Sequence, residues 1–174
     1  FASRLEADAQ GLASLLAREL GKLERESAGE VEGAASELRY YAGMARIMAG
    51  RLVETGPGIS SLLMREAAGV VGIIVPWNAP LILLIRSLAP AMAAGCTVVI
   101  KAPPQTALFM ARVIAHLSEI VELPRGVVNL VFEQGNGAAE EMVRSPEVDV
   151  ISYTGSTAVG KIIMAAAAPT LKRL

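Results

Sequence analysis

The sequence has 174 residues, and its 16 lysines and arginines against 17 aspartates and glutamates give a formal net charge of −1. This balance lacks the basic excess that binding to a nucleic-acid backbone requires, so we expect no nucleic-acid partner. Hydrophobic residues make up 53% of the chain, which excludes a disordered segment and predicts a folded core. The single cysteine, Cys96, excludes an internal disulfide, and the single histidine, His116, argues against a metal site. The sequence therefore predicts a cytoplasmic protein that binds no metal.

The strongest candidate for a membrane span is the apolar stretch from Ala79 to Ile100. Arg86, two prolines and Gly95 interrupt it, so no charge-free run reaches the ~18 residues that cross a bilayer. No signal peptide is visible, because neither an initiator methionine nor a basic flank precedes a short apolar core. We expect no membrane partner. We also expect the chain to be part of a longer protein, because residues 170–174 resemble the lead into another strand.

The first part of the chain, residues 1–58, is expected to be a helical lead-in segment. Leucines recur near helical spacing within residues 5–23, and a second apolar stripe runs from Val31 to Leu52. Turn residues at 55–58 are expected to end this second helix. The charged faces of this helical pair are typical of solvated surface, and no catalytic pattern is evident in it.

Residues 59–174 are expected to form an α/β domain. Apolar runs that favour strands alternate with helical stretches, which is the pattern of successive βαβ units. A continuous run such as Val70–Val75 suits a strand buried on both faces of a parallel sheet. The sequence thus predicts a Rossmann-like parallel sheet with flanking helices. The expected strands are 69–75, 97–100, 127–132 and 148–153, and the expected helices are 81–94, 106–121, 138–144 and 157–168.

Informative residues follow three of these predicted strands. Asn78 follows the first strand, Lys101 the second, and Gly155 with Ser156 the fourth. Ligands of open parallel sheets bind beyond the carboxyl ends of the strands. An amide, an ammonium group and a helix entrance are therefore expected to converge on a ligand site at one edge of the sheet.

The helix entrance at Ser156 fits an anion site. Ser156 is expected to cap a helix that starts at Thr157, where unpaired N–H groups and the helix dipole favour a pyrophosphate. By itself this motif fits an ordinary capped helix better than an anion site. Residues 155–161 also fit the phosphate loop Gly-x-x-x-x-Gly-Lys, but Ile162 stands where Mg²⁺ binding needs a hydroxyl. A P-loop NTPase is therefore a weak alternative.

Four segments with βα spacing carry a resemblance to a known family: Gly69–Asn78, Ala94–Lys101, Pro124–Asn129 and Tyr153–Gly160. In this order they resemble the aldehyde dehydrogenase superfamily, over nearly the whole chain, although members of that family are considerably longer. The resemblance implies an oxidoreductase that converts an aldehyde to a carboxylic acid with NAD or NADP, through a cysteine thiohemiacetal and a thioester. It also implies a homo-oligomer, either a dimer or a tetramer.

The resemblance assigns roles by position. Asn78 matches the side-chain amide that polarises the aldehyde oxygen, and Lys101 matches the lysine at the cofactor ribose. Ser156 matches the serine at the pyrophosphate, and Gly135 a glycine under the adenosine half. The full cofactor-binding set implied in this way is Trp77, Lys101, Pro103, Pro104, Gly135, Gly155, Ser156 and Val159.

Departures from the family pattern concern the cofactor and the substrate. Pro104 stands where many members have a glutamate that hydrogen-bonds the adenosine ribose, which opens the choice to NADP as well as NAD. Ala79 stands where many have an aromatic residue, and Glu133 where glycine is common.

The family's nucleophilic cysteine and general base match no residue of this chain. Cys96 precedes a strand, at the opposite end of the sheet, and is expected to be structural. His116 is expected at the helix surface or the edge of the core. A catalytically inert nucleotide-binding module or a folded fragment is therefore the alternative interpretation.

Overall fold

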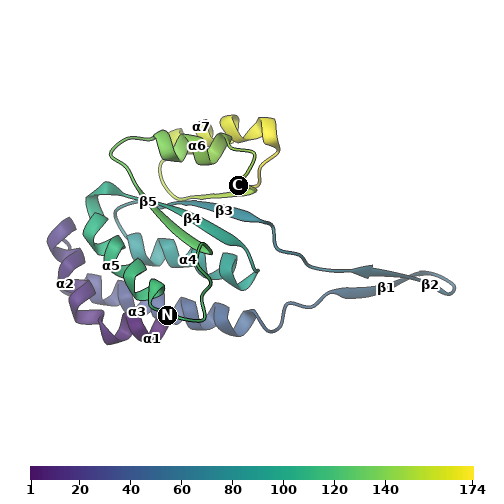
Figure 1. The fold of residues 1–174 in the computed structure, drawn as a ribbon, viewed down its shortest axis with the longest axis horizontal. Helices are drawn as coiled ribbons and strands as arrows, with labels where there is room; N and C mark the ends of the chain where they lie inside the picture. Colours follow the sequence, from purple (N-terminus) through teal and green to yellow (C-terminus); the bar gives the residue numbers. More distant parts are fainter.

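A parallel β-sheet lies at the centre of the computed structural model, which describes residues 1–174 (Figure 1). Its strands are β3 (Val70–Ile74), β4 (Thr97–Ala102), β5 (Val128–Phe132) and β6 (Val150–Tyr153). They follow the order β5-β4-β3-β6, and each neighbouring pair runs parallel. The carboxyl ends of all the strands therefore meet at one edge, as the sequence predicts.

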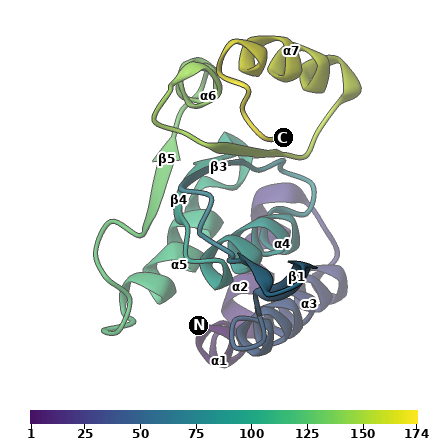
Figure 2. The same cartoon turned by 90° about the vertical axis from the view of Figure 1, so that its right-hand side faces the viewer.

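Helices cover both faces of this sheet (Figures 1 and 2). The helices α4 (Pro80–Ala93) and α5 (Ala107–Ser118) lie on one face, and α6 (Gly137–Arg144) and α7 (Thr157–Ala167) lie on the other. Alternate side chains of each strand enter different cores, so that Ile73 packs toward α4 while Ile74 packs toward α6 and α7. The predicted Rossmann-like α/β class is confirmed.

The N-terminal helices belong to the same core as the sheet. They are α1 (Ala2–Ala7), α2 (Ala9–Leu20) and α3 (Glu24–Met44), and they lie beneath α4 and α5. Leu12 and Val31 are fully buried in one cluster with Ile73 and Ile100. The expected helical pair is therefore three helices, because the first helix breaks at Asp8.

A β-hairpin replaces the end of the second predicted helix. α3 ends at Met44, and Leu52 lies in β1 (Arg51–Gly56), which pairs antiparallel with β2 (Ile59–Leu63). The helix predicted through Leu52 is therefore wrong. Its expected terminator is the hairpin turn, where Gly58 adopts the left-handed φ of 72° that a tight turn requires.

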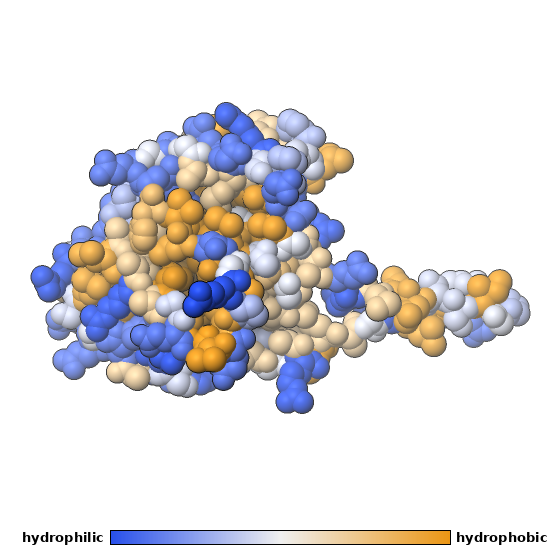
Figure 3. All heavy atoms as spheres, viewed as in Figure 1, coloured by the Kyte–Doolittle hydropathy of each residue, from blue (hydrophilic) through white to orange (hydrophobic).

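This hairpin extends away from the rest of the molecule (Figure 1). Its apolar side chains are exposed, and they appear as orange atoms on the projecting arm in Figure 3. Leu52 is 72% exposed and Leu62 is 66% exposed. The division expected at residue 58 falls within the turn of this arm.

The other predicted elements of the α/β part lie within about three residues of their observed bounds. Two short 3₁₀ turns, η1 (Pro104–Thr106) and η2 (Ala168–Thr170), complete the structure. Arg173 forms a parallel bridge with Val150, which places the last residues beside β6. None of the helices is both long and apolar enough to cross a membrane.

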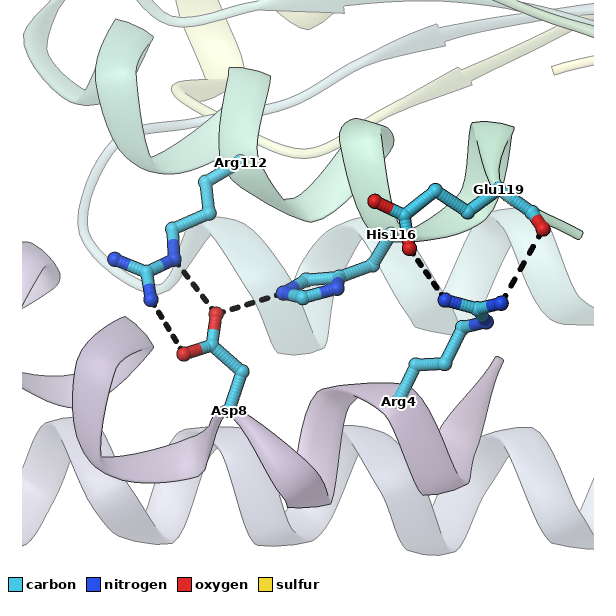
Figure 4. Close-up of polar contacts among 5 residues, drawn as sticks. All are labelled: Arg4, Asp8, Arg112, His116 and Glu119. Carbon is cyan, nitrogen blue, oxygen red and sulfur yellow. Dashed lines mark hydrogen bonds and ion pairs between the residues drawn. The ribbon is translucent and has the colours of Figure 1, made fainter.

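A cluster of charged residues joins the N-terminal helices to α5 (Figure 4). Arg112 Nε donates to Asp8 Oδ2 at 2.6 Å, and His116 Nε2 lies 2.7 Å from the same oxygen. One turn away, Arg4 pairs with Glu119. Burial of the Asp8 carboxyl opposes its ionisation, but the hydrogen bonds from Arg112 and His116 outweigh that effect and lower the pKa of Asp8. His116 thus lies at the edge of the core, as predicted.

The lowered pKa of Asp8 predicts a pH-dependent stability. A carboxyl whose folded pKa lies below its unfolded value, 3.8, stabilises the fold above that value and loses the effect as pH falls through the folded pKa. We expect Asp8→Asn to lower the free energy of unfolding by ~1 kcal/mol at neutral pH, and by progressively less below about pH 4. Urea denaturation across this range measures the difference.

The exposed Arg4–Glu119 pair supplies the control. Glu119→Gln is expected to change the free energy of unfolding by less than ~0.5 kcal/mol, because solvent screens this pair. An Asp8→Asn loss of equal size at about pH 7 and about pH 3 would contradict the assignment.

Candidate functional site

The order of the strands reverses between β3 and β6, and a cavity lies at this point. β4 and β5 follow on one side of β3, whereas β6 pairs with its other side. Such a switch point forms a crevice at the carboxyl ends of the strands, where ligands of open α/β sheets bind. The cavity here measures 430 Å³ and is walled by α6 and α7.

Four members of the expected site line this cavity: Trp77, Lys101, Gly155 and Val159. The other five members do not line it. Asn78 is exposed after β3, and Ser156 caps α7. Pro103 is buried after β4, Pro104 is exposed in η1, and Gly135 is exposed in the loop before α6.

Lys101 is the most unusual residue of the cavity. It is only 9% exposed, because it lies near the end of the central strand β4 and points to the face covered by α6 and α7. No carboxylate lies within ion-pair distance of its ammonium group, and no protein acceptor is hydrogen-bonded to it. A buried charge is costly unless a partner compensates it. The cavity therefore presents an uncompensated positive charge to whatever occupies it.

The entrance to α7 is built by Gly155 and Ser156. Ser156 Oγ accepts a hydrogen bond from the N–H of Val159 at 3.3 Å, which confirms the predicted cap. A Cβ at Gly155 would lie 2.1 Å from Tyr153 Oη, so glycine is needed for the close packing of this turn. The N–H groups of the first helical turn have no partner within the helix.

The P-loop alternative does not fit this geometry. α7 already begins at Thr157, so Gly160 and Lys161 are helical residues. A phosphate loop needs the residues before that glycine, here 157–159, in a loop whose backbone N–H groups surround the phosphates.

Carboxylates close the N-termini of the neighbouring helices. Glu133 accepts hydrogen bonds from the N–H groups of Ala138 at 2.8 Å and Ala139 at 3.2 Å, at the start of α6. Glu19 does the same for Leu108 and Phe109 in α5. These carboxylates neutralise the positive ends of α5 and α6.

Sequence reasoning missed several residues of the cavity. Tyr153 ends β6, and Asn136 stands directly before α6, so both follow the rule that strand ends and helix starts carry the site. Glu140 and Arg144, paired at 3.6 Å, belong to α6. The apolar wall has no local signal, because it arises only when two helices pack together: Val143, Ile162, Ile163 and Ala166.

A larger hollow of 740 Å³ lies at the opposite edge of the sheet, where none of the expected site residues lies, and two of its charged side chains are already paired. Asp149 accepts a hydrogen bond from the N–H of Val70 at 2.8 Å, and Lys172 donates to the carbonyl of Ser145 at 2.7 Å. Cys96 also lies toward this edge, 4% exposed in the core at the start of β4, in agreement with the predicted structural role. We therefore place the functional site in the smaller cavity.

The sheet, its crossover helices and the cavity at its carboxyl edge define a Rossmann-like α/β protein. The sequence matches the aldehyde dehydrogenase family over residues 1–174, and the chain belongs to this family.

Individual relatives agree with this assignment. The chain is 40% identical to the mitochondrial succinate-semialdehyde dehydrogenase of Arabidopsis thaliana over 173 residues, which are 98% of this chain and 32% of the relative. It is 39% identical to a probable succinate-semialdehyde dehydrogenase [NADP(+)] of Sinorhizobium fredii over 166 residues, covering 94% and 33%.

A solved structure matches as well. The betaine aldehyde dehydrogenase of Staphylococcus aureus, solved in complex with NAD+, superposes with a TM-score of 0.94 at 33% identity. The match covers 99% of this chain and 34% of that structure. The chain thus spans about a third of the length of the relatives it matches.

Two glycines near Tyr153 give opposite predictions for stability. Gly155→Ala is expected to cost ~1 to 3 kcal/mol, because the Tyr153 ring must move to admit the new methyl group. Gly160→Ala is expected to stabilise by up to ~1 kcal/mol, because it lies inside α7 and its Cβ would be 3.8 Å from the same ring. Thermal unfolding of both variants tests this contrast, and shifts of equal sign would contradict it.

Proposed function

We propose that this chain is the cofactor-binding part of an NAD(P)-dependent aldehyde dehydrogenase. The observation that carries the proposal is the unpaired ammonium group of Lys101, a residue only 9% exposed, in the cavity at the switch point of the sheet. A ribose hydroxyl or a phosphate oxygen would supply the acceptor that the protein does not. One relative is named for NADP(+) and one similar structure is a complex with NAD+, which supports either dinucleotide as the cofactor.

The entrance to α7 supports the position of the pyrophosphate. Of the helices that follow strands, α7 has a neutral hydroxyl cap from Ser156, whereas carboxylates close α5 and α6. An anion is attracted to a helix N-terminus by free N–H groups and by the dipole, and repelled by a carboxylate. Val159 and Trp77 line the same cavity and would enclose the apolar parts of the dinucleotide.

Asn78 carries the proposed catalytic role within this chain. It follows β3 at the carboxyl edge and is exposed, so its amide can donate a hydrogen bond to a substrate oxygen. In the proposed reaction a cysteine thiolate adds to the aldehyde, and water hydrolyses the resulting thioester. NAD(P), when bound, would supply the acceptor for the hydride that leaves the adduct. A neutral donor stabilises the oxyanion of the first step without forming an ion pair with it.

The thiolate of this reaction is not among the residues described. The one cysteine, Cys96, is buried at the amino edge of the sheet, away from Asn78 and Lys101. This position favours the second candidate, an inert nucleotide-binding module, for residues 1–174 taken alone. The homo-oligomer, the cytoplasmic location and the absence of a nucleic-acid partner are predictions from the sequence.

Substitutions at Asn78 and Lys101 separate catalysis from cofactor binding. In the complete protein, Asn78→Ala is expected to lower kcat ~10²- to 10³-fold and to leave NAD(P) affinity nearly unchanged. Lys101→Met is expected to weaken cofactor affinity ~10-fold, through the loss of a charge-assisted hydrogen bond. Steady-state kinetics with an aliphatic aldehyde and titration with NAD and NADP measure both effects.

A loss of cofactor affinity in place of turnover would refute the role assigned to Asn78. If Asn78→Ala weakens cofactor binding with normal turnover, Asn78 is not the oxyanion donor. Cofactor binding by a parent protein without any turnover would favour the inert module.

Pro104 is proposed to widen the choice of cofactor. It is exposed at the start of η1 and places no carboxylate near a ribose phosphate, whereas a like-charge pair at ~4 Å costs up to ~4 kcal/mol at an effective dielectric constant of ~20. Solvent reduces that penalty at an exposed site. We expect kcat/KM for NAD and NADP to lie within ~100-fold of each other, or ~2.7 kcal/mol.

Pro104→Glu is expected to move this ratio toward NAD, because the new carboxylate can accept hydrogen bonds from the ribose hydroxyls and repel a 2′-phosphate. Both cofactors are to be compared at saturating aldehyde, in the parent and in the variant. A parent preference beyond ~10⁴-fold, or an unchanged ratio in the variant, would assign the choice to another residue.

A further inference from the structure

The start of α4 is capped by a residue from another helix. α4 begins at Pro80, and its N-cap residue Ala79 has no side chain that can accept a hydrogen bond. Glu30 of α3 takes that place, since its Oε1 accepts from the N–H of Leu81 at 2.8 Å and of Ile82 at 3.4 Å. Glu30 is only 8% exposed, so its carboxylate needs these donors and a cation.

That cation is Lys22, and it also reaches the loop after β3. Lys22 lies in the turn between α2 and α3, just after Gly21, whose φ of 71° ends α2. Its Nζ lies 2.5 Å from Glu30 Oε2 and donates to the backbone carbonyl of Asn78 at 3.2 Å. The Lys22 ammonium group therefore links α3 to the loop before α4, and Glu30 links both to the first turn of α4.

Few other contacts hold the loop between β3 and α4, residues 75–79. Asn78 and Trp77 are both exposed, and the bond from Lys22 to the Asn78 carbonyl is the one protein hydrogen bond that either residue makes. The backbone of Asn78 is thus oriented by β3 on one side, by the start of α4 on the other and by Lys22 between them. That backbone orientation sets the position of its Cβ and limits the rotamers that its side chain can adopt.

We propose that Lys22 and Glu30 are positioning residues for Asn78. Glu30 fixes Lys22 through their ion pair, and Lys22 fixes the peptide group of Asn78, so that the amide is held in place before a substrate arrives. This inference rests on the proposed oxyanion role of Asn78. A displacement of about 1 Å in a catalytic group costs up to ~10²-fold in rate, so a distant charge can affect turnover without touching the substrate.

Lys22→Met removes the ammonium group and keeps an alkyl chain of similar length. In the complete protein we expect kcat to fall ~10-fold, with KM for the aldehyde and affinity for NAD(P) within ~2-fold of the parent. Arg39→Met is the matched control, because it also removes a cation, here from α3 itself, and the exposed pair of Arg39 with Glu6 is not connected to Asn78. Its kcat is expected to stay within ~2-fold of the parent.

A double-mutant cycle with Asn78→Ala distinguishes positioning from general stabilisation. If Lys22 acts through the Asn78 amide, Lys22→Met has no further effect on kcat once that amide is absent. A purely structural contribution would slow the Asn78→Ala protein by the same factor as the parent. The proposal is overturned by that equal factor, or by a Lys22→Met kcat within ~2-fold of the parent.

The two proposals fail in different ways. A parent protein that binds NAD(P) but oxidises no aldehyde, or an Asn78→Ala variant with normal kcat, refutes the proposed function. A slow Asn78→Ala variant together with a normal Lys22→Met variant refutes only the positioning role. Should Lys22→Met not fold, Glu30→Gln enters the same cycle, because it keeps an acceptor for α4 and weakens the hold on Lys22.

Discussion

The N-termini of the helices that follow the strands depend on carboxylates supplied by other parts of the chain. Each helix start leaves N–H groups without partners and a positive dipole end, and a carboxylate satisfies both. Glu30 closes α4, Glu19 closes α5 and Glu133 closes α6. Two of these carboxylates come from α2 and α3, so the N-terminal helices are joined to the sheet layer by polar caps as well as by apolar packing.

α7 is the one helix after a strand that no carboxylate caps, and this difference makes one part of the sheet's carboxyl edge positive. α7 begins with the hydroxyl of Ser156, and the ammonium group of Lys101 lies in the adjoining cavity, so positive potential is left uncancelled there and cancelled elsewhere. An anionic ligand would therefore find one favourable helix end along this edge, which supports a single orientation for a dinucleotide. The same capping carboxylate that closes α4 also retains Lys22 beside the Asn78 loop.

Periodicity and strand-end reasoning predicted the α/β body because both depend on neighbours in sequence. The run at Val70–Val75 is buried on both faces, and Lys101 and Gly155 line the cavity as expected. The caps had no such signal, since Glu30 and Leu81 are 51 residues apart and meet only after α3 packs on α4. The hairpin did have a signal. Two runs that favour strands flank Pro57–Gly58, but apolar spacing up to Leu52 also fits a helix, and pairing with β2 decides between them.

The projecting arm formed by β1 and β2 has a consequence for how this chain opens. None of its residues is buried, and its hydrogen bonds join the two strands to each other. The stability of the arm is therefore almost independent of the stability of the sheet. An isolated two-stranded hairpin is only marginally stable in water. Amide protons of the arm should therefore exchange with solvent through local opening, whereas those of β3 and β4 should exchange only when the whole core unfolds. The molecule thus consists of two cooperative units of very different stability within one continuous chain.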